Sequence, residues 1–165
     1  MFSIFQNYFK FAFVRNPWDW QVSWYHFIVQ NRTHHEHEAV TSLGSFADFL
    51  RWRIDHPVWH QKDFIADEGG IEIVDFVGKF ENLEADFAHV CAVAGVGAQL
   101  PHLNRSRHAD YRRYYCDRSC LLLEQYSKAD IEYFGYSFDP APDATPVILP
   151  AVVAPASPVA VRRAA

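Results

Sequence analysis

Residues 9–25, which read FKFAFVRNPWDWQVSWY, decide the fold class of this 165-residue chain. Residues 9–14 are rich in aromatic and β-branched side chains, which predicts a short, well-buried strand. Asn16 is a favourable N-cap, and Pro17 suits the first position of a helix. Apolar side chains then recur at helical spacing, at Trp18, Val22, Tyr25 and Val29. The segment therefore predicts a strand, a tight turn and a helix.

Further elements follow along the chain. Residues 71–77 (IEIVDFV) predict a second buried strand, and Asn82 can cap a helix that ends near Gly95 or Gly97. Ser45 begins another helix, and residues 117–128 predict a last one with Asp117 as its cap. Buried parallel strands need neighbours on both sides. The pattern therefore predicts an α/β fold containing part of a parallel sheet, with a strand missing.

Composition divides the chain into a globular part and a tail. All 27 aromatic residues lie within residues 1–138, and six of the nine prolines follow residue 139. We therefore expect one domain over residues 1–139 and a disordered, Ala/Pro/Val-rich tail over residues 140–165.

Charge and apolar patterning exclude several classes of protein. Net charge is −5, and residues 1–139 carry 13 Lys and Arg against 19 Asp and Glu, so a general nucleic-acid binder is not expected. An anionic ligand would have to be held by a few placed arginines and backbone amides. The sequence shows neither a secretory signal nor an apolar run near the ~20 residues of a membrane helix. The three cysteines show neither a disulfide-scaffold nor a zinc-binding pattern. These features predict a cytoplasmic protein with free, buried thiols.

Arg15 and Ser23 are the first candidates for binding. Arg15 follows a strand and precedes a helix, where α/β sheets bind anions. Ser23 lies about 10 Å beyond Asn16 along an ideal helix, so one phosphate could bridge the two side chains. The alternative is that Arg15 forms a structural ion pair and Ser23 faces solvent. His26, one turn further, is either a base facing a cleft or a packed histidine.

Three stretches in order resemble the carbohydrate (Golgi-type) sulfotransferase family, and together they cover most of residues 8–138. FAFVRNPWDWQVSWY (residues 11–25) is similar to the family's 3′-phosphate-binding motif. IVDFVGKFENLEADFAHVCAVAGV (73–96) is similar to its segment with Gly-Lys/Arg-Phe-Glu-Asn-Leu. LPHLNRSRHADYRRYYCDRSCLLLEQYSKADIEYFGYSF (100–138) is similar to its C-terminal signature.

The resemblance implies a P-loop-like α/β sulfotransferase fold. It also implies sulfuryl transfer from 3′-phosphoadenosine 5′-phosphosulfate to a carbohydrate hydroxyl, without a metal. By position, Arg15 and Ser23 would hold the 3′-phosphate. Asn104, Ser106 and Arg107 would contribute further nucleotide contacts from the following loop. Trp20 stands where many members have a basic residue, which puts an extra cationic contact there in doubt.

One part of the family's site has no counterpart in the sequence. The family's 5′-phosphosulfate loop precedes the 3′-phosphate motif, and residues 1–8 do not contain it. Around Gly78-Lys79, Ile73 and Phe80 occupy the positions that a P-loop gives to Gly and Ser/Thr. We therefore expect a truncated member with doubtful catalysis. The alternative is a non-catalytic remnant that binds adenosine 3′,5′-bisphosphate weakly or pairs its open sheet edge with another chain.

The remaining clusters predict no site. Residues 34–38 hold three histidines and two glutamates but lack His-Glu-x-x-His spacing, and the polar residues 31–38 predict a solvated loop. Cys116 and Cys120 share a helical face without a second ligand pair, which favours a place in the core.

Overall fold

The computed structural model describes residues 8–56, 60–101 and 108–139. The longer elements are β1 (Phe11–Val14), α2 (Pro17–Gln30), α3 (His37–Thr41), α4 (Phe46–Asp55), β2 (Phe76–Lys79), α5 (Leu83–Ala94), α6 (Asp117–Tyr126) and α7 (Lys128–Phe134). Short 3-10 turns are η1 (Gln61–Phe64), η2 (Phe80–Asn82) and η3 (Tyr111–Tyr114). The predicted tail, residues 140–165, lies outside the described residues and stays a prediction.

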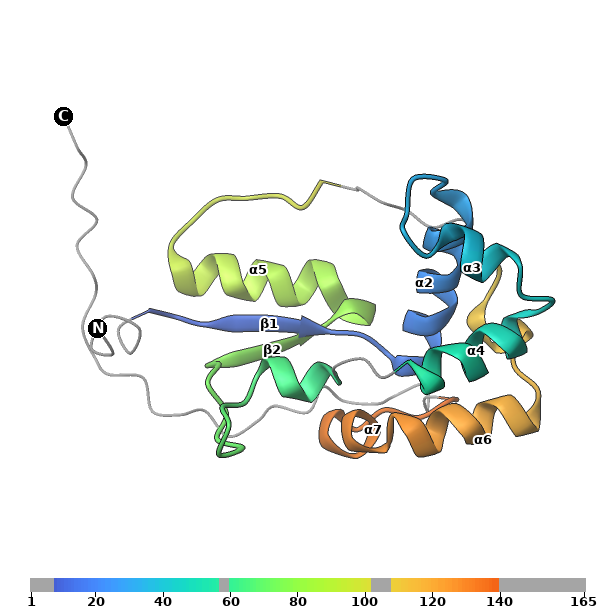
Figure 1. Ribbon diagram of the computed structural model, residues 1–165. Helices are drawn as coiled ribbons and strands as arrows, with labels where there is room; N and C mark the ends of the chain where they lie inside the picture. Colours follow the sequence, from blue (N-terminus) through green and yellow to red (C-terminus); the bar gives the residue numbers. More distant parts are fainter. Residues whose placement is uncertain (1–7, 57–59, 102–107, 140–165) are drawn as a thin grey trace.

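The predicted parallel pairing is present but small. β1 and β2 run parallel, from the pair Phe11 and Phe76 to the pair Val14 and Lys79, and they form a two-stranded sheet among the described residues. Figure 1 shows α5 along one side of the strand pair and α6 and α7 on the other, with α2, α3 and α4 gathered where β1 ends. The fold is therefore mixed α/β and mostly helical.

Both strands differ from their predicted form. Phe11 is 44% exposed, so β1 is buried at its carboxyl end, around Val14, rather than throughout. β2 begins at Phe76, five residues later than expected. The reason is a tight turn in which the Asp67 carboxylate accepts hydrogen bonds from the amides of Gly69 and Ile71. The turn pairs residues 71–73 with residues 65–67 in an antiparallel bridge, so the start of the predicted strand does not pair with β1.

The start of α2 confirms the prediction from Asn16 and Pro17. The Asn16 side chain accepts hydrogen bonds from the amides of Trp18 (3.0 Å) and Asp19 (3.4 Å). Pro17 occupies the first helical position, where its missing N–H costs nothing. The Ser45 cap of α4 is also confirmed, because its hydroxyl accepts from the Asp48 amide.

The C-terminal helical region differs from the single helix predicted. It is two helices, α6 and α7, which meet at the buried Ser127. Cys116, not Asp117, is the N-cap of α6 and its side chain is exposed, so the expected core position for Cys116 is wrong. Cys91 is buried and Cys120 is half-buried, and all three thiols are free.

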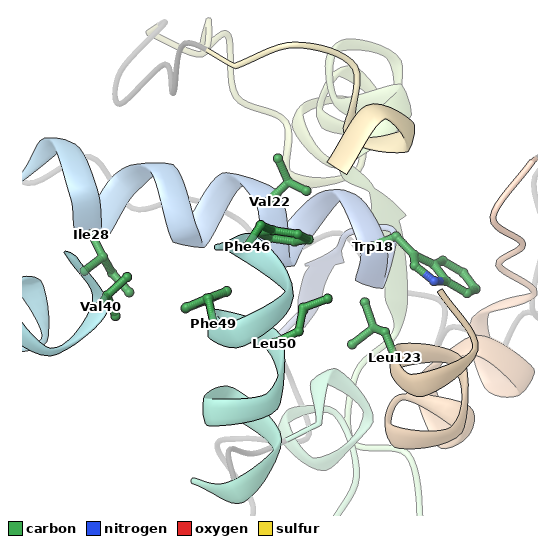
Figure 2. Close-up of a cluster of buried hydrophobic side chains, with 8 residues drawn as sticks. All are labelled: Trp18, Val22, Ile28, Val40, Phe46, Phe49, Leu50 and Leu123. Atoms are coloured by element: carbon green, nitrogen blue, oxygen red, sulfur yellow. The ribbon is translucent and has the colours of Figure 1, made fainter. Parts of the chain in front are cut away.

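The larger hydrophobic core lies among helices rather than on the sheet. Figure 2 shows side chains of α2, α3, α4 and α6 meeting in it: Trp18, Val22, Ile28, Val40, Phe46, Phe49, Leu50 and Leu123. A smaller cluster of Val14, Ile65 and Phe134 lies at the end of β1. The junction of β1 and α2 is therefore fixed by two cores, one on each side. In the described parts of the chain, no helix has both the length and the apolar character that crossing a membrane requires.

Candidate functional site

Arg15 occupies the junction where β1 ends, and its main chain is clamped on both sides. The Arg15 amide donates to the Gln61 side-chain oxygen and the Gln61 side-chain amide donates to the Arg15 carbonyl, both at 2.8 Å. Gln61 is held in turn by Asp130 of α7. This buried carboxylate, 1% exposed, accepts from the amides of Gln61 and Lys62 at 2.9 Å each. Residues from two distant segments, η1 and α7, therefore set the position of Arg15.

The Arg15 guanidinium forms a structural ion pair, as the alternative interpretation expected. Its Nε and Nη2 atoms both lie 2.7 Å from one oxygen of Asp19, four residues along the chain. Its plane lies over the Phe80 ring, 4.2 Å from the centroid. Yet 19% of the side chain stays exposed, and both of its contacts to Asp19 go to one carboxylate oxygen, from Nε and Nη2. Because a guanidinium carries five N–H donors, Arg15 retains donors for a phosphate despite the ion pair.

The amides at the start of α2 are already used by the protein. Asn16 donates its own amide to the Glu81 carboxylate at 2.6 Å, and the next two amides bond to the Asn16 side chain. The other Glu81 oxygen accepts from the Tyr136 hydroxyl at 3.2 Å. An anion at this junction would therefore be bound by side chains, not by the backbone amides that serve this purpose in many α/β folds.

Ser23 lies in the second turn of the unbroken helix α2 and is half-buried. The structure thus keeps the helical spacing of about 10 Å from Asn16 that the motif requires. Asn104, Ser106 and Arg107 lie outside the described residues, so their role as nucleotide contacts stays a prediction. The residue that follows them, His108, is described, and its ring contacts α2.

His26 is a packed histidine, and it belongs to a cluster beside Ser23. Its Nε2 atom lies 2.8 Å from the hydroxyl oxygen of Tyr114 in η3. Its ring stacks on that of His108, with centroids 5.4 Å apart and planes 19° from parallel. Burial, and to a lesser degree the neighbouring His108, lower the pKa of His26 below its ordinary value. His26 is therefore biased towards its neutral form.

The loop predicted over residues 31–38 is present over residues 31–36, where Arg32, Thr33 and His35 are exposed, but it is not solvated throughout. The His34 side chain is only 11% exposed and packs against Trp24 and Phe27 of α2, while α3 begins at His37. Aromatic packing outweighs polarity here because α2 presents a broad apolar face. No group of three possible metal ligands occurs within residues 8–56, 60–101 and 108–139.

Sequence reasoning missed three residues that shape the site: Asp19, Gln61 and Glu81. Asp19 carried a partial signal, because it is an acidic residue in the first turn of the predicted helix, four positions after Arg15, which directly precedes the N-cap. Gln61 and Glu81 lie 46 and 65 residues from their partners, and no local pattern marks them.

Comparison with known proteins places the chain in a family. The sequence profile described as "Sulfotransferase family" matches residues 2–137. The chain belongs to the sulfotransferase family. Membership implies 3′-phosphoadenosine 5′-phosphosulfate as the sulfuryl donor and an acceptor substrate. Comparison with curated proteins and with solved structures gave no match.

In this member of the sulfotransferase family, Arg15 and Ser23 lie on the unit formed by β1 and α2, within the residues that the family profile matches. The structure adds the acidic partner Asp19 and the main-chain clamp from Gln61. A donor nucleotide would therefore meet an arginine fixed in place but already partly neutralised.

Proposed function

We propose that the chain binds the 3′-phosphate of 3′-phosphoadenosine 5′-phosphosulfate at the junction of β1 and α2, as part of sulfuryl transfer to a carbohydrate hydroxyl. Arg15 and Ser23 are the primary contacts, with Asn104, Ser106 and Arg107 as further ones. The observation that carries the proposal is Arg15, held by its main chain at the strand end with unused guanidinium donors.

The geometry favours a phosphate over other anions. A guanidinium offers parallel N–H donors that match two oxygens of one phosphate, and such charge-assisted pairs are among the stronger hydrogen bonds. Because Gln61 fixes the main chain of Arg15, little backbone entropy is lost when a ligand binds.

These residues orient the donor rather than perform the transfer. Sulfuryl transfer resembles phosphoryl transfer in that positioning and charge stabilisation at the moving group supply most of the rate enhancement. Holding the 3′-phosphate anchors one end of the nucleotide, which restricts where the 5′-phosphosulfate can lie. The acceptor class and a cytoplasmic location remain part of the proposal.

Calorimetric titration tests the proposal directly. The chain is titrated with adenosine 3′,5′-bisphosphate and, for comparison, with adenosine 5′-monophosphate. We expect binding that requires the 3′-phosphate and that weakens at least about tenfold in Arg15→Ala, since hydrogen bonds to charged groups contribute about 1.5–3 kcal/mol. Arg51→Ala is the matched control, because Arg51 is 53% exposed and pairs with Asp48 on α4. Equal affinity for both nucleotides, or equal weakening in both variants, would contradict the proposal.

A second candidate is a non-catalytic chain that binds adenosine 3′,5′-bisphosphate weakly or pairs its sheet edge with another chain. The Arg15–Asp19 ion pair favours weak binding, because Asp19 competes with the phosphate for the guanidinium. The 44% exposure of Phe11 on β1 favours the pairing. Transfer of labelled sulfate from the donor to a panel of carbohydrates separates the candidates: transfer supports the enzyme, and binding without transfer supports the second candidate.

A further inference from the structure

Two histidines lie beside the proposed phosphate site, and the proposed function uses neither. His26 comes from α2 and His108 from the segment that leads into η3, 82 positions later in the chain. Their rings stack at 5.4 Å, and the Tyr114 ring meets both edge-on, at 5.2 Å from His26 and 6.4 Å from His108. The three rings form one cluster, and we call its two histidines, His26 and His108, the pair.

The cluster lies close to Ser23 by the geometry of α2. Residues three apart share a face of a helix, so His26 and Ser23 occupy successive turns of one face. Helical side chains lean towards the N-terminus, so the His26 ring covers the turn that carries Ser23. His108 also directly follows residues 102–107, which contain the other predicted nucleotide contacts. His26 thus lies one turn from Ser23 on the same face of α2, and His108 stacks on His26; on this ground we place both rings beside the proposed 3′-phosphate.

The described part of the phosphate site carries little net positive charge, because its one cation, Arg15, is paired with a carboxylate. The phosphate monoester carries a charge between −1.5 and −2 near neutral pH. Arg15 already shares its charge with Asp19, and Trp20 supplies no cation. The globular residues 1–139 as a whole are acidic, with 13 basic against 19 acidic residues. Tight binding of the phosphate therefore needs charge from elsewhere.

We propose that His26 and His108 form a second part of the phosphate site and that they take up a proton when the 3′-phosphate binds. The inference rests on the proposed function, since it uses the same phosphate position. In the ligand-free protein, burial and the neighbouring ring of His108 disfavour a charge on His26. A phosphate beside them reverses that preference, because it attracts the imidazolium form.

The surroundings of the pair are consistent with this role. Of the titratable groups on the described elements that pack against α2, Tyr114 and His108 contact His26. Within the described residues no carboxylate lies within ion-pair distance of either ring. The pair thus has no resident counter-ion there, and an incoming phosphate would be the first anion it meets. Tyr114 keeps the His26 ring in place through the 2.8 Å contact.

The sign of the pH dependence follows from proton linkage. The burial and the neighbouring ring that lower the pKa of His26 act in the free protein, and a bound phosphate raises that pKa again. A group whose pKa is higher in the complex makes binding tighter as the pH falls. Each unit of difference adds up to about tenfold in affinity.

The test is calorimetric titration of the full chain with adenosine 3′,5′-bisphosphate at pH 8 and pH 6, in two buffers of different ionisation enthalpy. Wild type is compared with His26→Gln, whose amide can still bond to Tyr114, and with His108→Gln. His89→Gln is the matched control, because His89 is an exposed histidine on α5 that stacks on Phe76. The phosphate titrates near pH 6 in every variant, so the difference between variants is the measured quantity.

We expect wild type and His89→Gln to gain several-fold more affinity on going from pH 8 to pH 6 than either site variant gains. At pH 8 all four proteins should bind alike within about twofold, because attraction between a protonated imidazole and the phosphate then contributes least to binding. Net proton uptake should be smaller in His26→Gln than in wild type. Identical pH dependence and proton uptake in all variants would overturn the inference while leaving the role of Arg15 intact. Loss of binding in wild type at both pH values would instead overturn the proposed function, and the inference with it.

Discussion

Replacing Asp130 by Asn should destabilise the protein strongly and loosen the phosphate site. Asp130 is 1% exposed, and its two oxygens accept from the amides of Gln61 and Lys62 at 2.9 Å each. Asn keeps one acceptor oxygen but turns its NH2 group towards the other N–H donor. Gln61 in turn clamps the main chain of Arg15, so the change should reach the proposed site.

The magnitude follows from those two bonds. One charge-assisted hydrogen bond contributes about 1.5–3 kcal/mol, and a buried donor left unpaired costs about 1–3 kcal/mol. Together they predict a loss of about 3 kcal/mol or more, a large part of the ~5–15 kcal/mol that stabilises a typical domain. With a urea m-value of ~1.5–2 kcal/mol/M, the unfolding midpoint should fall by about 1.5–2 M.

Urea unfolding followed by tryptophan fluorescence measures this shift. Glu132→Gln is the matched control, because Glu132 lies on the same helix, is 68% exposed and pairs only with Lys128, at 3.6 Å within the described residues. Its midpoint should move by less than about 0.5 M, as expected for an exposed ion pair. Similar midpoints for the two variants would refute the argument that Asp130 ties η1 and Arg15 to α7.

Two further predictions concern parts of the structure away from the site: the packing of the strand pair and the reactivity of Cys116. Gly78→Ala should destabilise the protein by ~1–3 kcal/mol, because a Cβ atom there would lie 2.5 Å from the Phe13 ring. Gly97→Ala is the control and should change stability by less than ~1 kcal/mol, because a Cβ atom at that position would meet nothing within 4 Å. Equal urea midpoints for the two variants would contradict the packing of β1 against β2. Cys116 should be alkylated by iodoacetamide before the other two cysteines, because hydrogen bonds from Ser119 lower the pKa of its exposed thiol, and Ser119→Ala should slow that reaction at pH 7.5. Mass spectrometry of the partly labelled chain identifies the first site, and early labelling at either other cysteine would count against this reasoning.

Helix caps could be predicted from the sequence, because a capping residue bonds to neighbours two or three positions away. Asn16 and Ser45 cap α2 and α4 as predicted, because their partners lie two to three residues away. Gly95 ends α5 in the left-handed conformation that favours glycine. The second strand was misplaced because the Asp67 side chain, which organises the turn before it, leaves no periodic signal.

The site was predictable only in part, and the reason lies in sequence separation. Arg15 and Ser23 could be singled out because one strand and one helix carry both. The residues that fix Arg15 lie far away in the sequence. Gln61, which bonds to Arg15, is 46 residues from it, and Asp130, which bonds to Gln61, is a further 69 residues along the chain. Hydrogen bonds of this kind have no period or spacing, so they emerge only from the tertiary structure.

The arrangement around Arg15 suggests how an acidic chain can bind a dianion at all. Asp19 holds the guanidinium in one orientation, which costs electrostatic attraction but reduces the entropy lost when a phosphate binds. If histidines then supply charge only in the complex, the free protein avoids exposing an unpaired cationic cluster. Asp19→Asn should therefore reduce the pH dependence of phosphate binding, because a less neutralised Arg15 offsets more of the phosphate charge and weakens the attraction between that phosphate and a protonated His26. Calorimetry at pH 8 and pH 6 measures this effect, and an unchanged pH dependence in Asp19→Asn would show that the two charges act independently.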